Sequence, residues 1–305
     1  MHAGQMTAPQ SVWKALPWLM TLILLASLTF FSMSPQFIPK NHQRQHKRLF
    51  GSAAARPRCR IEALGSVQQF YDYFRNLEYQ CKDLRVFGSR PFRTDGIKYV
   101  CLDERFALKP HNCTVVSFGI NYEWDFEDDM DEFGCKVHAF DPTMKQLDHQ
   151  RSPRVFFYKL GIGSVKGKRK IGMNKDIDFF EVDRYENILR RLGLQDSRID
   201  YLKLDVELSE LEFLQDVLRS TPHLLRNVAQ MGIEIHHGYQ GEGVDDKPPL
   251  AGALSPTSTF PLFWSHFQEL RCHGFRLLHV RSNGPWHEVV WGRSDHWLLG
   301  SEEVG

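Results

Sequence analysis

Short apolar, β-branched segments alternate with helical patterns from about residue 113 onward, and this alternation constrains the fold more than any other feature. Strands are expected at residues 113–117, 136–140, 155–160, 199–204, 228–235, 275–280 and 288–299. Helices are expected between them, at residues 121–133, 143–147, 182–192, 209–219 and 262–272. Such alternation predicts an α/β fold: a mostly parallel, seven-stranded sheet with helices on both faces and a C-terminal antiparallel hairpin.

Polar residues and glycines stand where the expected strands end. The carboxyl ends of parallel strands share one edge of a sheet, and ligands bind there, at the switch point in strand order. We therefore expect one binding site along that edge. The candidate residues are Ser117, Gly119, Asn121, Asp141, Gly161, Asp205, Glu234 and His236.

Gly119 follows the first strand. A glycine allows positive φ or close approach by a ligand, although an ordinary turn glycine would look the same. The surrounding Ser117–Asn121 segment (SFGIN) lacks the second and third glycines of the dinucleotide fingerprint. An acidic run follows it and would repel a phosphate. A nucleoside without phosphates is therefore the better expected ligand.

Asp141 ends the second strand, 22 residues after Gly119. A carboxylate at this point can accept hydrogen bonds from both hydroxyls of a ribose. The alternative is a purely structural role, in which Asp141 caps the expected helix at residues 143–147 and Pro142 occupies the first helical position.

The segment Lys203–Glu207 (KLDVE) is the most distinctive part of the sequence. Asp205 and Glu207 could hold a divalent cation, orient a hydroxyl or act as a general base, or they could cap the next helix. His236 could remove a proton from a substrate near neutral pH, although His236–His237 could also be structural. The cysteines lack zinc-site spacing, so no metal ligands are assigned and a divalent cation has no direct support.

Residues 15–39 contain no charged residue, and their core at residues 16–33 is apolar enough to span the ~30 Å hydrocarbon layer. We expect a retained membrane anchor, with a cleaved signal peptide as the alternative. The remaining divisions are an N-terminal tail at residues 1–14, a basic stalk at 40–61, a helical N-terminal extension at 62–100 and the main domain at 101–300.

Two signals disagree about the side of the membrane on which the main domain lies. Lysines and arginines follow the apolar span, and the positive-inside rule would keep the domain in the cytosol. The Asn112-Cys113-Thr114 sequon favours the lumen, as do six cysteines, which are enough for one to three disulfides. With 38 basic and 37 acidic residues, the net charge of +1 gives no reason to expect nucleic-acid binding.

Several segments together resemble class I S-adenosylmethionine-dependent methyltransferases, and among them the FkbM-like group. LKLDVE and IEIH are the most specific blocks. The similar segments are VCLDERF (Val100–Phe106), VSFGINYEWDFE (Val116–Glu127), CKVHAFDPT (Cys135–Thr143), YLKLDVELSELEFLQDV (Tyr201–Val217), GIEIHHGYQ (Gly232–Gln240) and FWSHFQELRCHGFRLLH (Phe263–His279).

The resemblance implies a Rossmann-like methyltransferase fold with a reversed last strand. It also implies S-adenosylmethionine as cofactor and methyl transfer to an oxygen or nitrogen of an unidentified acceptor. Carried over by position, Gly119 and its neighbours Ser117 and Asn121 would approach the methionine part of the cofactor, and Asp141 would bind its ribose. Gly161, at the end of the third expected strand, is added to the expected cofactor-binding residues. Asp205 would lie near the reacting centre, and we expect either Asp205 or His236 to be the catalytic base.

Members of this group are often membrane-anchored or secreted. The resemblance therefore implies a single-pass membrane protein with its catalytic domain in the lumen of the endoplasmic reticulum or Golgi, or a secreted protein after signal cleavage. The expected partners are the cofactor, an unknown acceptor and the membrane, through residues 15–39.

Two other functions remain open. One is a membrane-anchored glycosyltransferase that uses a nucleotide sugar, for which Asp176-Ile-Asp178 provides a DxD-like metal motif. The other is a catalytically inactive, methyltransferase-like binding module.

Overall fold

The computed structural model describes residues 60–91, 96–170, 179–207, 209–236, 259–283 and 286–294. The chain divides into two compact units, residues 1–54 and 55–305, and only the second contains described residues. The expected tail, the apolar span at residues 15–39, almost all of the basic stalk and the Asp176–Asp178 motif lie outside the described part. Within that part, no helix is both long and apolar enough to cross a bilayer.

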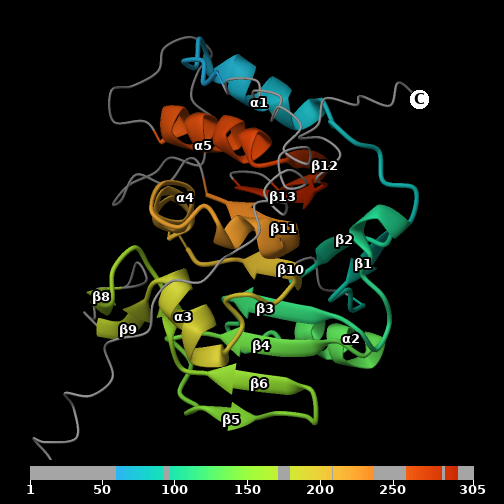
Figure 1. The fold of residues 1–305 in the computed structure, drawn as a ribbon, viewed down its shortest axis with the longest axis vertical. Coiled ribbons are helices and arrows are strands. Elements are labelled where there is room, and N and C mark those ends of the chain that lie inside the picture. The colour runs from blue at the N-terminus through green and yellow to red at the C-terminus, as the bar shows by residue number, and fades with distance from the viewer. Residues whose placement is uncertain are drawn as a thin grey trace, which may run out of the picture. The chain divides into compact units, whose positions relative to one another are not determined.

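One eight-stranded sheet organises the fold, in the order β12-β13-β11-β10-β3-β4-β6-β5 (Figure 1). Its parallel centre consists of β3 (Thr114–Phe118), β4 (Lys136–Phe140), β6 (Val155–Tyr158), β10 (Ile199–Leu204) and β11 (Val228–Ile235). This confirms the predicted α/β sheet.

The C-terminal hairpin closes one edge of the sheet. Its second strand, β13 (Trp286–Arg293), pairs antiparallel with β11, and its first strand, β12 (Phe275–Asn283), takes the outer edge. The predicted hairpin is thus confirmed. The opposite edge carries β5 (His149–Gln150), which was not predicted because two residues cannot show a periodic pattern.

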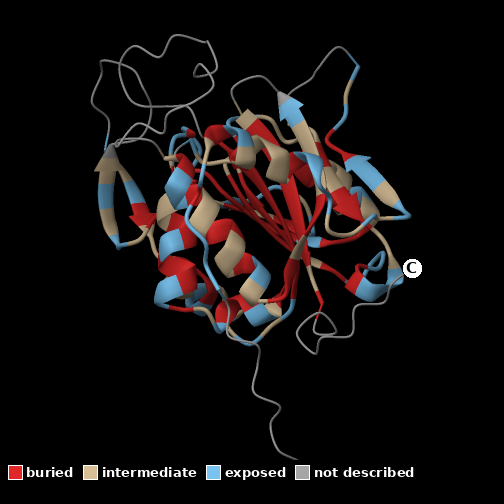
Figure 2. Cartoon of the chain, turned by 90° about the horizontal axis from the view of Figure 1, so that it is seen from above, coloured by how far each residue is buried: buried red, intermediate tan, exposed pale blue. Residues whose placement is uncertain are grey.

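The central strands are buried from both sides and appear as a continuous buried layer in Figure 2. Alternate residues face opposite cores, as the two-residue period of a strand requires. Val116 and Leu202 face a core formed with four helices. These are α1 (Val67–Arg75), α3 (Tyr185–Leu192), α4 (Glu210–Arg219) and α5 (Phe260–Cys272).

The other face is covered by one helix and a β-hairpin. Val115 and Tyr201, each next in sequence to a residue of the first core, pack against α2 (Asp125–Phe133) and the hairpin of β1 (Leu84–Phe87) and β2 (Lys98–Cys101). The short 3-10 helix η1 (Glu104–Phe106) adds Phe106 to this core. Helices therefore lie on both faces, as predicted.

Three expected helical segments differ from the structure. No helix forms at residues 143–147, where Met144 is buried, Leu147 is exposed and the chain makes bends toward β5. The segment at 182–192 becomes helical only at α3, because β9 (Phe179–Asp183) precedes it. The extension at 62–100 is helical only in α1, because the alternating patterns of its second half form the β1–β2 hairpin.

A small three-stranded sheet lies beside the large one, in the order β7-β9-β8. It contains β7 (Gly161–Ile162), β8 (Gly167–Lys170) and β9. Another 3-10 helix, η2 (Leu224–Asn227), leads into β11.

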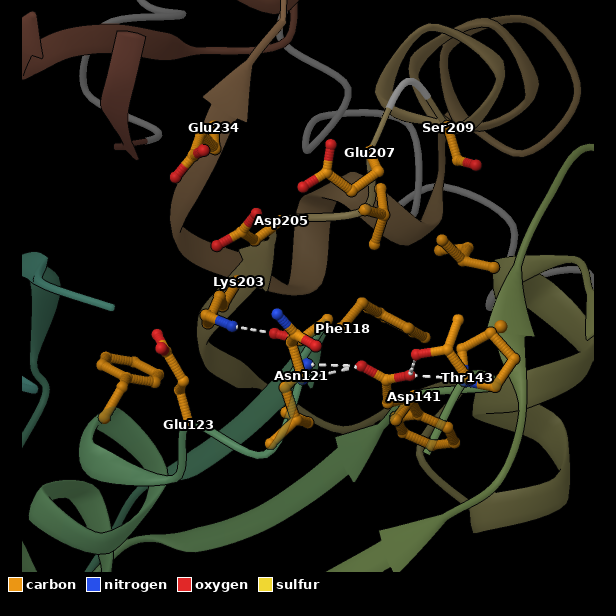
Figure 3. A pocket seen from close by; sticks show the side chains of 18 of the residues that line it. Phe118, Asn121, Glu123, Asp141, Thr143, Lys203, Asp205, Glu207, Ser209 and Glu234 are labelled. Carbon is orange, nitrogen blue, oxygen red and sulfur yellow. Dashed lines mark hydrogen bonds between the residues drawn. The ribbon is translucent and has the colours of Figure 1, made fainter. Parts of the chain in front are cut away.

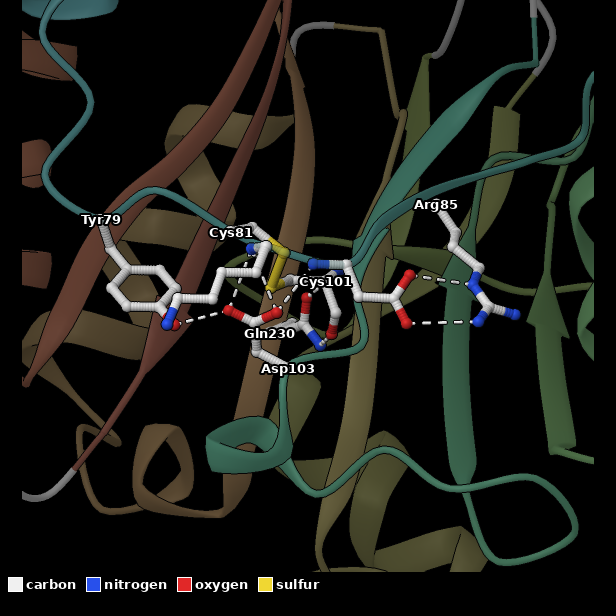
Figure 4. Close-up of a disulfide and its surroundings, with 8 residues drawn as sticks. Tyr79, Cys81, Arg85, Cys101, Asp103 and Gln230 are labelled. Atoms are coloured by element: carbon white, nitrogen blue, oxygen red, sulfur yellow. Dashed lines mark hydrogen bonds and ion pairs between the residues drawn. A yellow bond between two sulfur atoms is a disulfide. The ribbon is translucent and has the colours of Figure 1, made fainter.

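Two disulfides lie at the core that α2 and the β1–β2 hairpin form with the sheet. Cys81 is bonded to Cys101 at the end of β2, and Cys113 is bonded to Cys135. Gln230 of β11 accepts a hydrogen bond from the Cys101 backbone N–H and donates one to its carbonyl (Figure 4). The β1–β2 hairpin is therefore fixed to the main sheet at its carboxyl end.

Candidate active site

A cavity of about 240 Å³ opens at the carboxyl edge of the sheet, where β3, β4, β10 and β11 end (Figure 3). Five of the predicted cofactor or catalytic residues line it together: Gly119, Asn121, Asp141, Gly161 and Asp205. Glu207 and Glu234 also line it. The predicted convergence of strand ends in one pocket is therefore observed, whereas the chemical role of each residue stays a prediction.

Gly119 must be glycine because another part of the chain approaches it closely. It has φ +83°, and a Cβ atom placed on it would lie 1.6 Å from the carbonyl oxygen of Asp205. The approaching group is therefore the end of β10. This close contact holds the ends of β3 and β10 together beneath the pocket.

Asp141 organises the loop that follows β3. Its Oδ2 accepts hydrogen bonds from the backbone N–H groups of Ile120 and Asn121, both at 2.9 Å. Its Oδ1 accepts from the backbone N–H and the hydroxyl of Thr143, at 2.8 and 2.6 Å. All four acceptor positions of the carboxylate are thus engaged. A ribose would have to replace one of these bonds, most simply the one from the Thr143 hydroxyl.

Ser117 lies beneath the pocket rather than on its wall. Its buried hydroxyl donates to Glu127 of α2 at 2.5 Å. Burial raises the pKa of Glu127, while the ammonium of Lys203, 3.8 Å away, lowers it in part. Lys203 also donates to the Gly119 carbonyl and lines the cavity. Lys203 was not predicted as a site residue, although a lysine near the carboxyl end of an expected buried strand was a signal for one.

Lys98 brings an ammonium group from β2 to the carboxyl edge of the main sheet. The side chain is 1% exposed, and its Nζ lies 2.6 Å from Glu288, 3.1 Å from Asp205 and 3.4 Å from Glu234. Burial alone would lower the pKa of Lys98, but the three carboxylates raise it well above its usual value. Lys98 therefore stays charged and holds β2, β10, β11 and β13 together.

Asp205 remains ionised in this environment. Burial alone would raise its pKa, but the positive charges of Lys98 and Lys203 outweigh that effect and lower it. Glu288 responds in the opposite direction, because burial outweighs the attraction of Lys98 and raises its pKa to about 7. Asp205 thus keeps its charge and faces the cavity, whereas Glu288 does not line it.

His236 does not line the cavity. Its Nδ1 lies 3.0 Å from Glu210 of α4, and its Nε2 lies 3.3 Å from Glu234. Burial lowers the pKa of His236, but the hydrogen bonds to these two carboxylates outweigh burial and raise it to about 11. A histidine that keeps its proton at neutral pH cannot accept another, so this geometry does not favour the predicted role as general base.

Comparison with known sequences identifies the family. A family model described as a methyltransferase domain matches residues 29–275. The chain belongs to the methyltransferase-domain family. The methyltransferase-domain protein is 28% identical over 224 residues to probable methyltransferase-like protein 24 of Rattus norvegicus, covering 70% of this chain and 57% of that relative. The Homo sapiens protein of the same name is 28% identical over 185 residues, covering 59% and 47%. The chain spans about half the length of these curated relatives.

Solved structures give only a distant match to this methyltransferase-domain protein. A crystal structure of a mutant 16S rRNA (adenine(1408)-N(1))-methyltransferase from Catenulisporales acidiphilia is 14% identical. The match covers 65% of this chain and 94% of that one, with a TM-score of 0.34. At that score it carries no argument about the site.

S-adenosylmethionine is the cofactor of such a methyltransferase domain, and the pocket fits its chemistry. The side chains of Phe118, Phe140 and Ile162 provide apolar surface suited to an adenine ring. The acidic lining side chains outnumber the one basic side chain among the described lining residues, Lys203. This charge suits a ligand that carries a sulfonium and an ammonium group. The acidic lining residues are Glu123, Asp141, Asp205, Glu207 and Glu234.

Proposed function

We propose that this protein transfers a methyl group from S-adenosylmethionine to an oxygen or nitrogen atom of an acceptor. The supporting observation is the convergence of Gly119, Asp141, Gly161 and Asp205 in one cavity at the carboxyl edge of a methyltransferase-domain sheet. Membership of the FkbM-like group belongs to the same proposal and is supported by the LKLDVE and IEIH segments.

Different residues of the cavity have different roles in the proposed transfer. Phe118, Phe140 and Ile162 bind the adenosine part, and the loop at Gly119–Asn121, held by Asp141, lies against the methionine part. When bound, S-adenosylmethionine supplies a methyl group on a cationic sulfur. Asp205, kept ionised by Lys98 and Lys203, orients the attacking atom of the acceptor.

The transfer balances without a further reactant. The acceptor atom forms a bond to the methyl carbon, and the electron pair of the broken carbon–sulfur bond goes to sulfur. The proton of the acceptor leaves to solvent, directly or through Glu207 at the cavity wall. Alignment of the reacting atoms is the main contribution that we assign to the protein.

Thermal unfolding of the full chain with S-adenosylhomocysteine tests the proposal. A ligand that binds only the native state must raise the melting temperature, and the rise should increase with its concentration. A sugar nucleotide serves as the matched control and should give no shift. A shift with the sugar nucleotide alone would support the glycosyltransferase instead, and no shift at millimolar S-adenosylhomocysteine would contradict cofactor binding.

Asp205→Asn separates binding from transfer. The variant should still be stabilised by S-adenosylhomocysteine, since its side chain remains polar and of the same size, but methylation of acceptor extracts should fall at least about tenfold. If the wild-type protein binds the cofactor yet transfers no methyl group to any acceptor pool, the inactive binding module becomes the better interpretation.

We further propose that this domain works in an oxidising compartment, anchored through residues 15–39. The disulfides Cys81–Cys101 and Cys113–Cys135 support this location, because cytosolic thiols are kept reduced. Asn112 of the sequon is exposed, which a glycan requires. The proposed location is the lumen of the endoplasmic reticulum or Golgi, with secretion after signal cleavage as the alternative.

A further inference from the structure

Three side chains at the ends of β10 and β11 place potential metal ligands close together. Asp205, Glu234 and His236 each offer one ligand atom, and the three atoms lie within 4.8 Å of one another. This spacing suits ligands around one cation, since metal–oxygen and metal–nitrogen distances of about 2.0–2.2 Å place opposite ligands just over 4 Å apart. Asp205 and Glu234 also line the cavity, so a cation held here would face it.

His236 is oriented as a metal ligand would be. Glu210 is fully buried, and its Oε1 lies 3.0 Å from His236 Nδ1 and accepts a hydrogen bond from the Val206 backbone N–H. A carboxylate on Nδ1 fixes the ring and directs Nε2 toward Glu234 Oε1, 3.3 Å away. The same carboxylate–histidine arrangement orients histidines that bind metals. A bound cation would displace the Nε2 proton to solvent, since only an unprotonated imidazole nitrogen coordinates a metal.

Negative charge surrounds this position. Among the described residues, Lys98 and His236 are surrounded by five carboxylates, and two of these have a buried oxygen without a hydrogen-bond partner there: Glu210 Oε2 and Glu288 Oε1. Lys203 compensates part of this charge at Asp205, Glu207 is largely exposed, and the pKa of Glu288 is raised to about 7, so Glu210 and Glu234 are the buried carboxylates that a cation beside His236 would stabilise. The five carboxylates belong to Asp205, Glu207, Glu210, Glu234 and Glu288.

Lys98 does not block such a site. Its Nζ contacts Asp205 Oδ2 and Glu234 Oε2, whereas Glu234 Oε1 is the oxygen that faces His236. Each carboxylate can therefore serve the ammonium with one oxygen and a cation with the other. The second ligand cluster of the described residues, at Cys81, Cys101 and Asp103, is unsuitable because its sulfurs form a disulfide.

We propose that Asp205, Glu234 and His236 bind one divalent cation at the wall of the cavity. Two carboxylate oxygens and one imidazole nitrogen form a mixed set that Mn²⁺ accepts well, since it binds both oxygen and nitrogen ligands. Its remaining coordination positions face the cavity. The sequence placed all three residues at one edge of the sheet, but it paired Asp205 with Glu207 as possible cation ligands and did not show that Glu234 and His236, at the end of β11, lie beside Asp205, which follows β10.

The consequence for chemistry rests on the proposed methyl transfer. A cation at this position lowers the pKa of a hydroxyl that binds to it, so the acceptor is an alcohol or phenol rather than an amine. The hydroxyl proton passes to water or Glu207, the oxygen bonds to the methyl carbon, and the carbon–sulfur electron pair goes to sulfur. A neighbouring oxygen on the acceptor would strengthen binding by chelation.

Titration of the metal-free full chain with Mn²⁺, followed by electron paramagnetic resonance, tests the site without any acceptor or cofactor. We expect one tight site per chain. Pulsed spectra should show coupling to one imidazole nitrogen, which requires no variant and cannot arise from carboxylates alone. His236→Gln should abolish that coupling and weaken binding at least about tenfold.

A matched pair on helix α4 tests the orientation of His236. Glu210→Gln should weaken Mn²⁺ binding about 10–100-fold by loosening the ring. Glu212→Gln, two residues along and paired with Arg169 instead, should leave the dissociation constant unchanged. Each variant is compared with wild type for its melting temperature, so that unfolding is separated from loss of a ligand.

Three results would overturn the proposal: no saturable Mn²⁺ binding at millimolar concentration, no nitrogen coupling in the bound state, or equal affinity in His236→Gln. These results are independent of the methyl-transfer proposal. Stabilisation by S-adenosylhomocysteine without Mn²⁺ binding would refute the metal site alone, and Mn²⁺ binding without stabilisation would refute the cofactor assignment alone.

Discussion

Three of the five described non-glycine residues with positive φ line the cavity or lie next to a lining residue. Asn121, Tyr122 and Glu207 have φ values of 45°, 62° and 46°, in the left-handed region that residues other than glycine rarely adopt. Each such position costs roughly 1–3 kcal/mol and persists only where neighbours fix it. Asp141 accepts from the Asn121 N–H, and the Tyr122 hydroxyl accepts from the Lys145 N–H. The structure thus maintains a costly loop shape at the site.

A buried neutral histidine should make this protein sensitive to acid. Burial, with a smaller effect of Lys136, lowers the pKa of His138 to about 4, against about 6.5 when unfolded. Its stabilising contribution is present above pH 6.5 and is lost as the pH falls toward 4, because the unfolded chain gains the proton first. The loss should reach up to ~3 kcal/mol.

Urea unfolding of wild type and His138→Phe, each at pH 7.5 and pH 4.5, measures this contribution. The phenylalanine ring keeps the stacking with Phe156 and Tyr158 and does not titrate. The variant should lose less stability between the two pH values than wild type. Equal losses would show that His138 does not contribute to acid sensitivity.

Individual site residues could be predicted only where they follow a strand directly. Asp141 and Asp205 were found because strand ends share an edge. Lys98 and Glu288 were not, because nothing in the local pattern of β2 or β13 indicates that their side chains meet Asp205. The role of Asp141 in shaping its loop was one of two interpretations that the sequence left open.

The β1–β2 hairpin is the element that most affects the site. It covers one face of the sheet and carries Lys98, and it is fixed by Cys81–Cys101, by Gln230 and by Asp103 (Figure 4). The Asp103 carboxylate accepts from the backbone N–H groups of Lys82 and Asp83 and from the hydroxyl of Tyr79. The register of β2, and hence the position of Lys98, depends on these ties.

Removing the hairpin disulfide should therefore affect both stability and the site. The bonded cysteines are 20 residues apart, so Cys81→Ser with Cys101→Ser should cost about 3 kcal/mol. It should also weaken S-adenosylhomocysteine binding several-fold, because the hairpin that carries Lys98 to the strand ends lining the cavity is no longer fixed. Calorimetric titration and thermal unfolding measure the two effects.

The second disulfide provides the matched control. Cys113 and Cys135 are 22 residues apart and lie at the amino ends of β3 and β4, away from the cavity. Replacing both with serine should cost a similar stability but leave cofactor affinity unchanged. If both double variants lost affinity equally, the effect would be one of general destabilisation rather than of the position of Lys98.

Elements were predicted well where the hydrophobic period was long and buried. β4, β10 and β11 begin and end at the residues predicted for them, because strands buried on both faces are mostly apolar along their whole length. The β1–β2 hairpin was missed because the helical period of α1 was extended past its end. The short helix at 143–147 was predicted from its capping residues alone. It does not form; the Asp141 carboxylate instead accepts hydrogen bonds from the backbone N–H and the hydroxyl of Thr143 in a local turn.

At the scale of the whole molecule, the disulfides and the sequon support the same compartment. Asn112 is exposed in a turn just before β3, where a glycan would extend into solvent. The full chain expressed in animal cells should therefore carry one N-linked glycan at Asn112, seen as an increase in gel mobility after glycosidase digestion.

Two variants distinguish a glycan at this site from glycosylation elsewhere. Asn112→Gln should run at the digested position without treatment, and so should Thr114→Ala, which leaves the asparagine in place but removes the sequon. If glycosidase digestion left the gel mobility of the wild-type protein unchanged, the result would favour the cytosolic orientation that the positive-inside rule indicates.

The ammonium group of Lys98 has a consequence for where a functional form of this protein can begin. Lys98 precedes every strand of the main sheet in the sequence, yet its ammonium group balances the charge of Asp205, Glu234 and Glu288. A transcript or proteolytic fragment that started at β3 would leave these acids facing one another without it. The shortest form able to work must therefore include the hairpin upstream of that strand.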